Sequence, residues 1–248
     1  MNTLGIIPAR YASSRFPGKP LADIHGKPMI QRVYEQCKKA KLLNELIVAT
    51  DDIRISQAVK TFGGRAMMTG IHHRSGTDRC TEVLINLEKE DRFFDVVVNI
   101  QGDEPYINPG QIGQVLQAFV DPDVSIATLA KKIQNPEELF SYDVVKVIRN
   151  KVNRAIYFGR QPLPFQRNVE KADWLSRFSY LKHVGLYAYR SETLKEISGM
   201  DASPLEKAES LEQLRWLENG YSIYVGLTEF ESIAVDKPED LSKFTNMY

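Results

Sequence analysis

The sequence has few cysteines, no excess of either charge and no long apolar run, and each absence excludes a class of protein. Only Cys37 and Cys80 occur among 248 residues, without a CxxC pattern or metal-ligand spacing, which argues against a disulfide scaffold and a zinc site. Lysine plus arginine and aspartate plus glutamate number 32 each, so the net charge attracts neither nucleic acid nor an anionic membrane. Any anionic ligand must therefore be held by a local basic cluster.

No apolar stretch is long enough to cross a bilayer, and the opening MNTLGIIPAR lacks the basic region and apolar run of a secretory signal. We therefore expect a cytoplasmic protein without stable membrane insertion, whose two cysteines pack in the core. With 43% hydrophobic and 26% charged residues, the composition is that of a globular chain. No repeat, low-complexity tract or linker divides it, so we expect residues 1–248 to form one domain.

Short apolar runs alternate with segments of helical periodicity along the chain. The runs that predict strands are Leu4–Ala9, Glu45–Thr50, Val96–Gln101, Val124–Ala130, Val144–Ile148, Val184–Tyr189 and Ser222–Leu227. The segments that predict helices are Met29–Ala40, Asp52–Phe62, Thr77–Leu87, Pro109–Phe119, Ser191–Ile197 and Leu205–Glu218. Helix starts are marked by Asn108 before Pro109 and by a capping box from Ser203 to Glu206.

The alternation in the first half predicts βαβ units, and hence an α/β fold with a mostly parallel sheet and helices on both faces. The segment from about 124 to 189 is richer in strands. We expect it to form an antiparallel flap or a dimer arm.

The first strand leads into the loop RYASSRFPGKP, which holds three cations, Arg10, Arg15 and Lys19. Ligands of α/β folds bind at the carboxyl ends of parallel strands. Three cations there match a triphosphate, and the small residues Ser13, Ser14 and Gly18 let the backbone approach it. Considered alone, the loop is equally compatible with a solvated basic segment. It is neither a Walker A motif, because Pro20 follows Lys19, nor GxGxxG.

Two acidic residues follow apolar runs. Asp103 follows the end of the strand predicted over Val96–Gln101, and Asp236 directly follows a short strand predicted over Ser232–Val235. Two such carboxylates can hold Mg²⁺ and leave room for phosphate oxygens and water. The alternative for each is that it caps the next helix.

At this point the motifs resemble a known family. In the order expected for CMP-Kdo synthetases (3-deoxy-manno-octulosonate cytidylyltransferases), the chain contains IIPARYASSRFPGKPL, HHRSGTDR, NIQGDEP, KHVGLYAYR, SPLEKAESLEQLRWLENG and AVDKPEDL. The opening PAR…GKPL is shared with CMP-sialate synthetases and other nucleotidyltransferases, whereas QGDEP together with LEQLR favours the Kdo branch. The resemblance covers essentially the whole chain.

The resemblance implies a Rossmann-like nucleotidyltransferase fold, a homodimer and Mg²⁺. It also implies the reaction of CTP with the sugar acid Kdo to CMP-Kdo and pyrophosphate, for lipopolysaccharide biosynthesis. The implied triphosphate ligands are Arg10, Arg15 and Lys19, and the implied Mg²⁺ ligands are Asp103 and Asp236. The nucleoside would lie against Pro8, Ala9, Arg74, Ser75 and Gly76, and the sugar against Gln101, Arg160, His183, Tyr187, Glu212 and Gln213.

Alternatives stay open for the residues assigned to the sugar and for the identity of the sugar. Without the resemblance, His183 would be a core histidine, and Glu209, Glu212 and Gln213 would form a solvated helix face. His25, His72 and His73 gain no catalytic role. The chain departs from the usual family pattern at Gly159, Pro164–Arg167, Lys207 and Ala234. These departures leave three substrates open: Kdo, its 8-amino form or another sugar acid. The alternatives of another class are a GT-A glycosyltransferase and a silent nucleotide-binding module.

Overall fold

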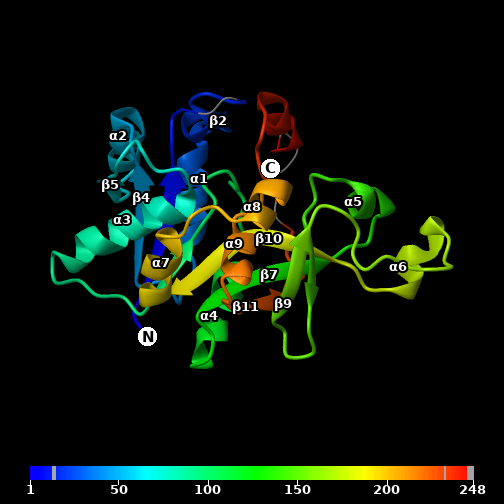
Figure 1. Cartoon of the computed structure of the whole chain (residues 1–248). Coiled ribbons are helices and arrows are strands. Elements are labelled where there is room, and N and C mark those ends of the chain that lie inside the picture. Colours follow the sequence, from blue (N-terminus) through cyan, green and yellow to red (C-terminus); the bar gives the residue numbers. More distant parts are fainter. Residues whose placement is uncertain (13–14, 232, 245–248) are drawn as a thin grey trace.

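The structure is a computed structural model that describes residues 1–12, 15–231 and 233–244, and a large sheet runs through its centre (Figure 1). In spatial order the strands are β11 (Ile223–Leu227), β7 (Ile126–Lys132), β10 (Leu181–Arg190), β6 (Val96–Asn99), β1 (Thr3–Ala9), β4 (Glu45–Thr50) and β5 (Ala66–Met68). The pairs β11–β7, β6–β1, β1–β4 and β4–β5 are parallel, whereas β10 runs antiparallel to β6 and β7. The predicted mostly parallel α/β sheet is confirmed, with β10 reversed.

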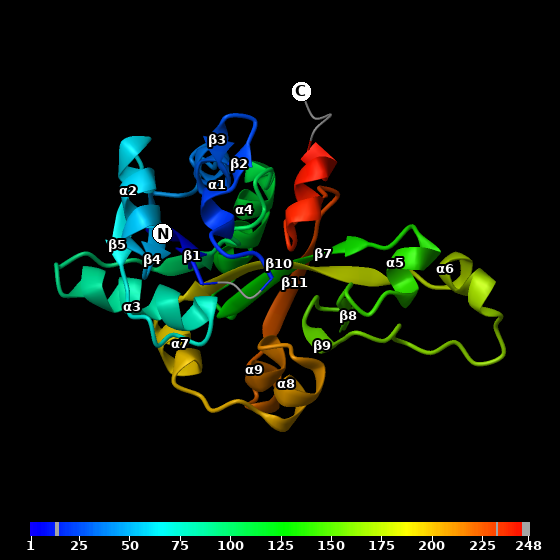
Figure 2. The same ribbon diagram turned by 90° about the horizontal axis from the view of Figure 1, so that it is seen from above.

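Helices cover both faces of this sheet, as predicted (Figure 2). One face is covered by α1 (Met29–Cys37), α2 (Ile53–Thr61) and α4 (Pro109–Gln117), and the other by α3 (Gly76–Glu88), α7 (Ser191–Ser198) and α9 (Gln213–Glu218). Successive strand side chains point to opposite faces, so in β1 Ile6 enters one core and Ile7 the other. Cys37 and Cys80 are fully buried in these two cores, which confirms their packing role.

An arm extends beyond β7 and β10. It contains β8 (Lys146–Arg149), β9 (Ala155–Gly159), α5 (Pro136–Phe140), η3 (Lys171–Asp173) and α6 (Trp174–Arg177). The strands β8 and β9 pair antiparallel, and β8 pairs with β10. The buried ammonium group of Lys146 ties the arm together, because it donates to the carbonyls of Ser141, Val144 and Arg160. The predicted antiparallel segment is confirmed, although β9 was not predicted.

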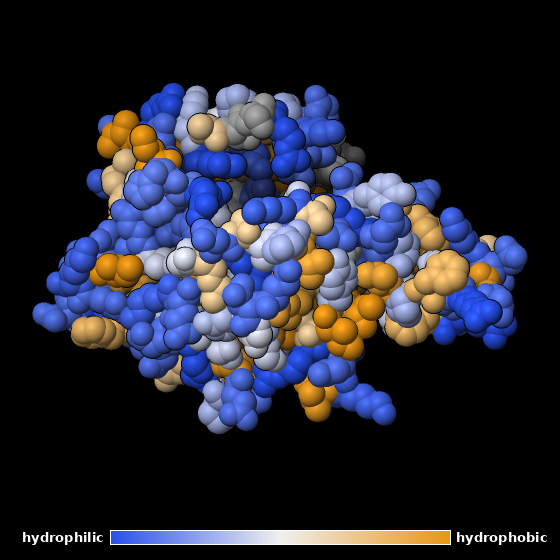
Figure 3. All heavy atoms as spheres, viewed as in Figure 1, coloured by the Kyte–Doolittle hydropathy of each residue, from blue (hydrophilic) through white to orange (hydrophobic). Residues whose placement is uncertain are grey.

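Apolar side chains stay exposed on the face that carries the β8–β9 hairpin (Figure 3). Large apolar residues exposed in this part of the chain include Val152 and Ile156 of the hairpin and Phe165 and Phe178 of the arm. None of the helices in the described part of the chain has both the length and the apolar character that a membrane crossing needs.

The predicted helix Leu205–Glu218 is wrong as one element. The chain forms α8 (Pro204–Glu209) and α9, and between them Ser210 adopts a left-handed conformation with φ 53°. A continuous helix cannot contain such a residue. The break allows Leu211 to be buried while Glu212 faces a cavity described below. The predicted cap of α8 is confirmed, because Ser203 and Glu206 form a capping box.

Several boundaries also differ from the prediction. The strand expected over Val96–Gln101 ends at Asn99, and the helix expected over Pro109–Phe119 ends at Gln117, followed by η2 (Ala118–Val120). Of the expected strand Ser232–Val235, Ser232 lies outside the described residues and 233–235 form no strand. The short elements β5, β2 (Asp23–Ile24) and β3 (Lys27–Pro28) were not predicted. The cap of α4 by Asn108, with Pro109 in its first turn, is confirmed.

Candidate active site

The loop after β1 turns sharply at Gly18 before the 3-10 turn η1 (Lys19–Leu21). Gly18 has φ 72°, its N–H donates to the carbonyl of Tyr11 at 2.9 Å, and an added Cβ would lie 3.1 Å from the Tyr11 ring. Only glycine combines this conformation with so close a contact. The Arg54 guanidinium stacks over the same ring at 3.3 Å. The turn therefore places Lys19 directly at the carboxyl end of β1; Ser13 and Ser14 lie outside the described residues.

Lys19 joins three segments that are distant in the sequence. Its ammonium group lies 2.6 Å from the Asp103 carboxylate and donates to the Val235 carbonyl at 2.9 Å. The Val235 N–H in turn donates to the Asp103 carbonyl at 2.9 Å. These contacts fix the loop after β6 and the C-terminal segment beside the loop after β1.

Asp103 reaches this position because the chain after β6 passes very close to β1. A Cβ added at Gly102 would lie 2.8 Å from the carbonyl oxygen of Pro8. That oxygen belongs to the backbone and has no freedom to move aside, so a larger residue at 102 would push the Asp103 loop outward. Because β6 ends at Asn99 rather than at Gln101, Asp103 lies in a loop four residues beyond the end of the strand and not directly at the strand end as predicted.

Asp236 lies near Asp103 through the C-terminal segment that precedes η4 (Pro238–Phe244). Its carboxylate pairs with Arg15 at 3.3 Å, and both side chains are more than half exposed. Such an exposed pair stabilises the fold little. The backbone at Asp236 and Lys237 is fixed by Asp240, whose carboxylate accepts hydrogen bonds from the N–H groups of both residues.

A cavity of about 270 Å³ lies above the ends of β1 and β6. It is lined by Pro8, Ala9, Arg10, Arg15, Lys19, Pro20, His73, Arg74, Ser75, Gly76, Arg79, Gln101, Gly102, Asp103 and Asp236. Every residue predicted to bind nucleotide or metal is in this set. We call this space the cationic cavity, because its lining contains five arginine or lysine residues against two aspartates.

The start of α3 forms one wall of the cationic cavity. Ser75 caps the helix in a capping box with Asp78, and Gly76 is the first helical residue. Backbone N–H groups in the first turn of a helix favour negatively charged ligands. This wall therefore adds to the attraction that the basic side chains exert on an anion.

A second cavity, of about 520 Å³, adjoins the first. The predicted sugar residues Gln101, His183, Tyr187, Glu212 and Gln213 all line it. Both cavities are bordered by Pro8, Gly76, Gln101, Asp103 and Asp236. The two carboxylates therefore lie where the cavities meet, and we call the second space the polar cavity.

The polar cavity offers fixed hydrogen-bonding groups. Burial lowers the pKa of His183 to about 3, so its imidazole is neutral at physiological pH, and its Nε2 lies 3.1 Å from the Thr128 hydroxyl. Burial raises the pKa of Glu212, against the effect of a hydrogen bond from Thr77 and of the nearby Arg215. The amide of Gln101 donates to the Gly185 carbonyl at 2.9 Å. These groups suit a ligand with several hydroxyls.

Arg160 is the one predicted sugar residue that lines neither cavity. Its guanidinium donates to the carbonyls of Glu209 and Tyr142, at 2.8 and 2.9 Å, and its backbone N–H donates to the Glu209 carboxylate. These bonds tie the end of β9 to α8. A contact between Arg160 and a sugar carboxylate stays a prediction.

Several cavity residues escaped the prediction from sequence, and four of them carry polar side chains that can contact a ligand. Asn99, Tyr189 and Ser210 line the polar cavity, and Arg79 lines the cationic cavity. Asn99 is 5% exposed, and its side-chain oxygen has no hydrogen-bond partner among the described residues. The signal for Asn99 was its place as a polar residue in the apolar run VVVNI, since a buried polar group without a partner is costly.

Asp103 and Asp236 fit a magnesium site. Both carboxylates border the two cavities and supply the oxygen donors that Mg²⁺ requires, and in the structure each is paired with a cation, Lys19 or Arg15. In the described ranges, no group of three or more histidine, cysteine, aspartate or glutamate side chains is arranged to hold a metal. Two carboxylates leave the other coordination positions to phosphate oxygens and water, as Mg²⁺ sites with phosphate substrates do.

Comparison with known proteins agrees with this geometry. A model of the family described as cytidylyltransferase matches residues 4–227. The 3-deoxy-manno-octulosonate cytidylyltransferase of Parabacteroides distasonis is 55% identical over 98% of this chain and 96% of its own length, and that of Bacteroides thetaiotaomicron is 56% identical over 97% and 96%. The solved structure of a CMP:2-keto-3-deoxy-manno-octonic acid synthetase complexed with CTP superposes with a TM-score of 0.90 at 44% identity, covering 98% of this chain and 96% of that one. The chain belongs to the cytidylyltransferase family, among its 3-deoxy-manno-octulosonate cytidylyltransferases.

Proposed function

We propose that the protein transfers the cytidylyl group of CTP to 3-deoxy-manno-octulosonate (Kdo), giving CMP-Kdo and pyrophosphate. The observation that carries this proposal is the position of Asp103 and Asp236 between a cationic and a polar cavity. A triphosphate fits the first cavity and a polyhydroxyl sugar acid the second. The reacting phosphorus and the sugar hydroxyl then meet beside the two carboxylates.

In this proposal the cationic cavity binds CTP. Lys19 and Arg15 hold the β- and γ-phosphates and stabilise the negative charge that grows on the departing pyrophosphate, while Arg10 acts closer to the α-phosphate. Because Lys19 also contacts Asp103 and Val235, its charge is held in place before the substrate arrives. The base lies against the segment Arg74–Gly76 at the start of α3.

Asp103 and Asp236 would hold Mg²⁺, which stabilises charge on the phosphates and lowers the pKa of a hydroxyl bound beside it. The anomeric oxygen of the sugar attacks the α-phosphorus. A new P–O bond forms, the bond between the α-phosphorus and the bridging oxygen breaks with its electron pair going to the departing pyrophosphate, and the hydroxyl proton passes to solvent water. The protein positions the two substrates and stabilises the negative charge of the transition state, and these two effects supply most of the rate enhancement in such transfers.

A covalent intermediate is not part of the proposal. Cys37 and Cys80 are fully buried, and burial raises the pKa of both thiols, so neither supplies a thiolate to the cavities. Lys19 is paired with Asp103 and positioned as a cation. Direct transfer between the two substrates needs none of these groups as a nucleophile.

Our first prediction concerns both substrates. With CTP and Kdo, the protein should release pyrophosphate, while ATP, GTP and UTP should be poor donors because the segment at Arg74–Gly76 selects the base. A panel of four nucleotides with Kdo, its 8-amino form and sialic acid tests this by pyrophosphate release and separates the possible sugars. A glycosyltransferase would release no pyrophosphate, and a silent module would bind CTP without turnover. Equal turnover with ATP and CTP would contradict the proposal.

Our second prediction concerns the carboxylates. Asp103→Asn and Asp236→Asn should each lower kcat roughly 10³-fold, since removing a metal ligand removes several kcal/mol of transition-state stabilisation. Asp201→Asn is the matched control, because Asp201 is exposed and lies away from both cavities. The measurement is kcat of each variant by steady-state kinetics, with circular dichroism to show that each variant is folded. A folded Asp236→Asn protein with near-normal kcat would exclude the ligand role.

We further propose that the protein is a cytoplasmic homodimer. The unpaired state of Cys37 and Cys80 agrees with a reducing compartment. A two-fold interface is the commonest arrangement of soluble oligomers, and the exposed apolar side chains of the arm, such as Ile156, suit one.

Our third prediction follows from this surface. Light scattering at micromolar concentration should give twice the mass of the chain, and Ile156→Asp should shift the protein to the monomer. Ile71→Asp is the control, because Ile71 is even more exposed but lies away from the arm, after β5. A monomeric wild-type protein, or a dimer unaffected by Ile156→Asp, would argue against an interface at the arm.

A further inference from the structure

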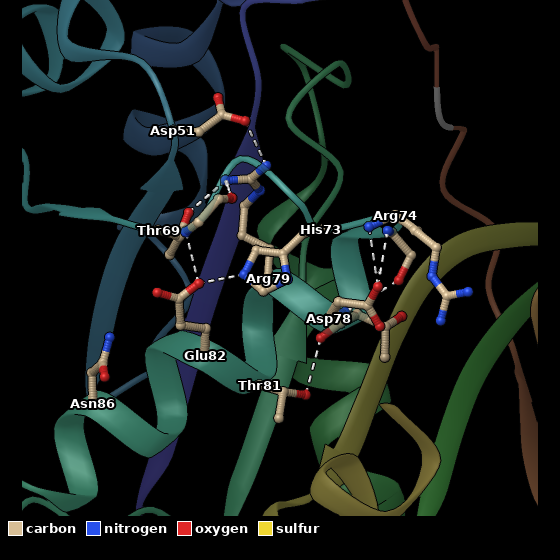
Figure 4. Close-up of polar contacts among 12 residues, drawn as sticks. Asp51, Thr69, His73, Arg74, Asp78, Arg79, Thr81, Glu82 and Asn86 are labelled. Carbon is tan, nitrogen blue, oxygen red and sulfur yellow. Dashed lines mark hydrogen bonds and ion pairs between the residues drawn. The ribbon is translucent and has the colours of Figure 1, made fainter. Parts of the chain in front are cut away.

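The segment Thr69–Ser75, which we call the base loop, connects β5 to α3 (Figure 4). Its last three residues, His73, Arg74 and Ser75, line the cationic cavity. The loop has no regular secondary structure, so its shape depends on side chains that hold it from outside. Those side chains come almost entirely from one face of α3.

The positions on α3 follow helical spacing. Asp78, Arg79 and Glu82 lie three, four and seven residues after the cap Ser75, and residues at these spacings share one face of a helix. In Figure 4 all three point toward the base loop. Side chains of the first two turns of α3 therefore fix the conformation of the base loop that precedes the helix.

Arg79 fixes the beginning of the loop. It is 4% exposed and pairs with Asp51 at 2.9 Å. The same guanidinium donates to the Thr69 hydroxyl and to the Gly70 carbonyl. At the other end of the loop, the Asp78 carboxylate accepts from the backbone N–H groups of Arg74 and Ser75, at 3.2 and 3.3 Å.

Glu82 joins the beginning of the loop to its middle. Its carboxylate accepts from the Gly70 N–H at 2.8 Å and pairs with the His73 imidazole. Burial acts to raise the pKa of Glu82, but the contacts with Gly70 and His73 outweigh it and keep the pKa below its ordinary value. The carboxylate is therefore ionised at neutral pH, the state that best holds both partners.

We propose that Glu82 is a positioning residue for base recognition: through Gly70 and His73 it holds the base loop in the shape that selects cytosine. This inference rests on the proposed function, in which the loop contacts the base of CTP. A loop held in its binding shape loses less conformational freedom when the ligand binds, and affinity rises accordingly. Loss of Glu82 should therefore weaken CTP binding and base selection, not the chemical step.

The test compares Glu82→Gln, Glu82→Ala and the control Glu88→Ala. Glu88 is on the same helix with a similar side-chain exposure, 24% against 30% for Glu82, and pairs with Lys195 instead of the base loop. The dissociation constant of CTP is measured by calorimetry without sugar. The ratio of kcat/KM for CTP to that for UTP is measured with Kdo.

We expect Glu82→Ala to raise the CTP dissociation constant about tenfold and to lower the CTP/UTP ratio similarly, with kcat at saturating CTP nearly unchanged. Glu82→Gln, which keeps an acceptor for the Gly70 N–H, should lie between Glu82→Ala and wild type, and Glu88→Ala should match wild type. A purely structural role would reduce the active fraction, and hence kcat, without changing the affinity of the folded protein or the CTP/UTP ratio.

The outcomes separate this inference from the proposed function. If wild type transfers cytidylyl groups but a folded Glu82→Gln or Glu82→Ala protein keeps both the affinity and the ratio, the positioning role is wrong and the function stands. If wild type binds CTP but turns over no sugar acid, the proposed function fails, and calorimetry on the variants still decides the role of Glu82 in CTP binding. A wild-type protein that does not bind CTP would overturn both.

Discussion

The contact of Lys19 with Asp103 and Val235 is the interaction on which the rest of the site depends. It joins segments that are more than 200 residues apart in the sequence, and it places a cation against Asp103, one of the two carboxylates that border both cavities. Two carboxylates brought together without a cation would repel each other. Lys19 and Arg15 contact Asp103 and Asp236 at 2.6 and 3.3 Å, so a cation offsets the charge of each carboxylate and holds it beside the cavities where a magnesium ion and a triphosphate would bind.

The sheet explains why two substrates can meet at this point. On the side of β1 and β6, parallel strands end in loops that hold cations and carboxylates, and α3 presents its N-terminus to the same space. Next to β6, the reversed strand β10 brings His183 and Tyr187 beside the same strand ends, and the break at Ser210 turns Glu212 toward them. One half of the site thus suits the nucleotide and the other half a hydroxyl-rich sugar. The junction between them is where the transfer reaction takes place in our proposal.

The sequence predicted the parallel half of the fold and the cationic cavity well, because both are encoded locally: apolar runs form strands, and the loop after β1 contributes three cations from ten consecutive residues. The polar cavity is different, since β6, β10 and α9 each contribute isolated side chains that only folding brings together. Ser210 was missed because helical periodicity continues across it, and a single left-handed residue leaves no pattern. Arg160 was placed by resemblance alone, whereas in the structure its guanidinium binds the carbonyls of Glu209 and Tyr142. Glu82 was missed because its role depends on two loop contacts that have no sequence signature.

The central claim is that sugar and nucleotide react directly with each other between the two cavities. The stereochemistry at the α-phosphorus tests it most directly, because a single displacement inverts that centre and two successive displacements restore it. CTP made chiral by one sulfur atom on the α-phosphorus should give CMP-Kdo with inverted configuration. Net retention in the product would contradict direct transfer and would require a covalent intermediate on the protein.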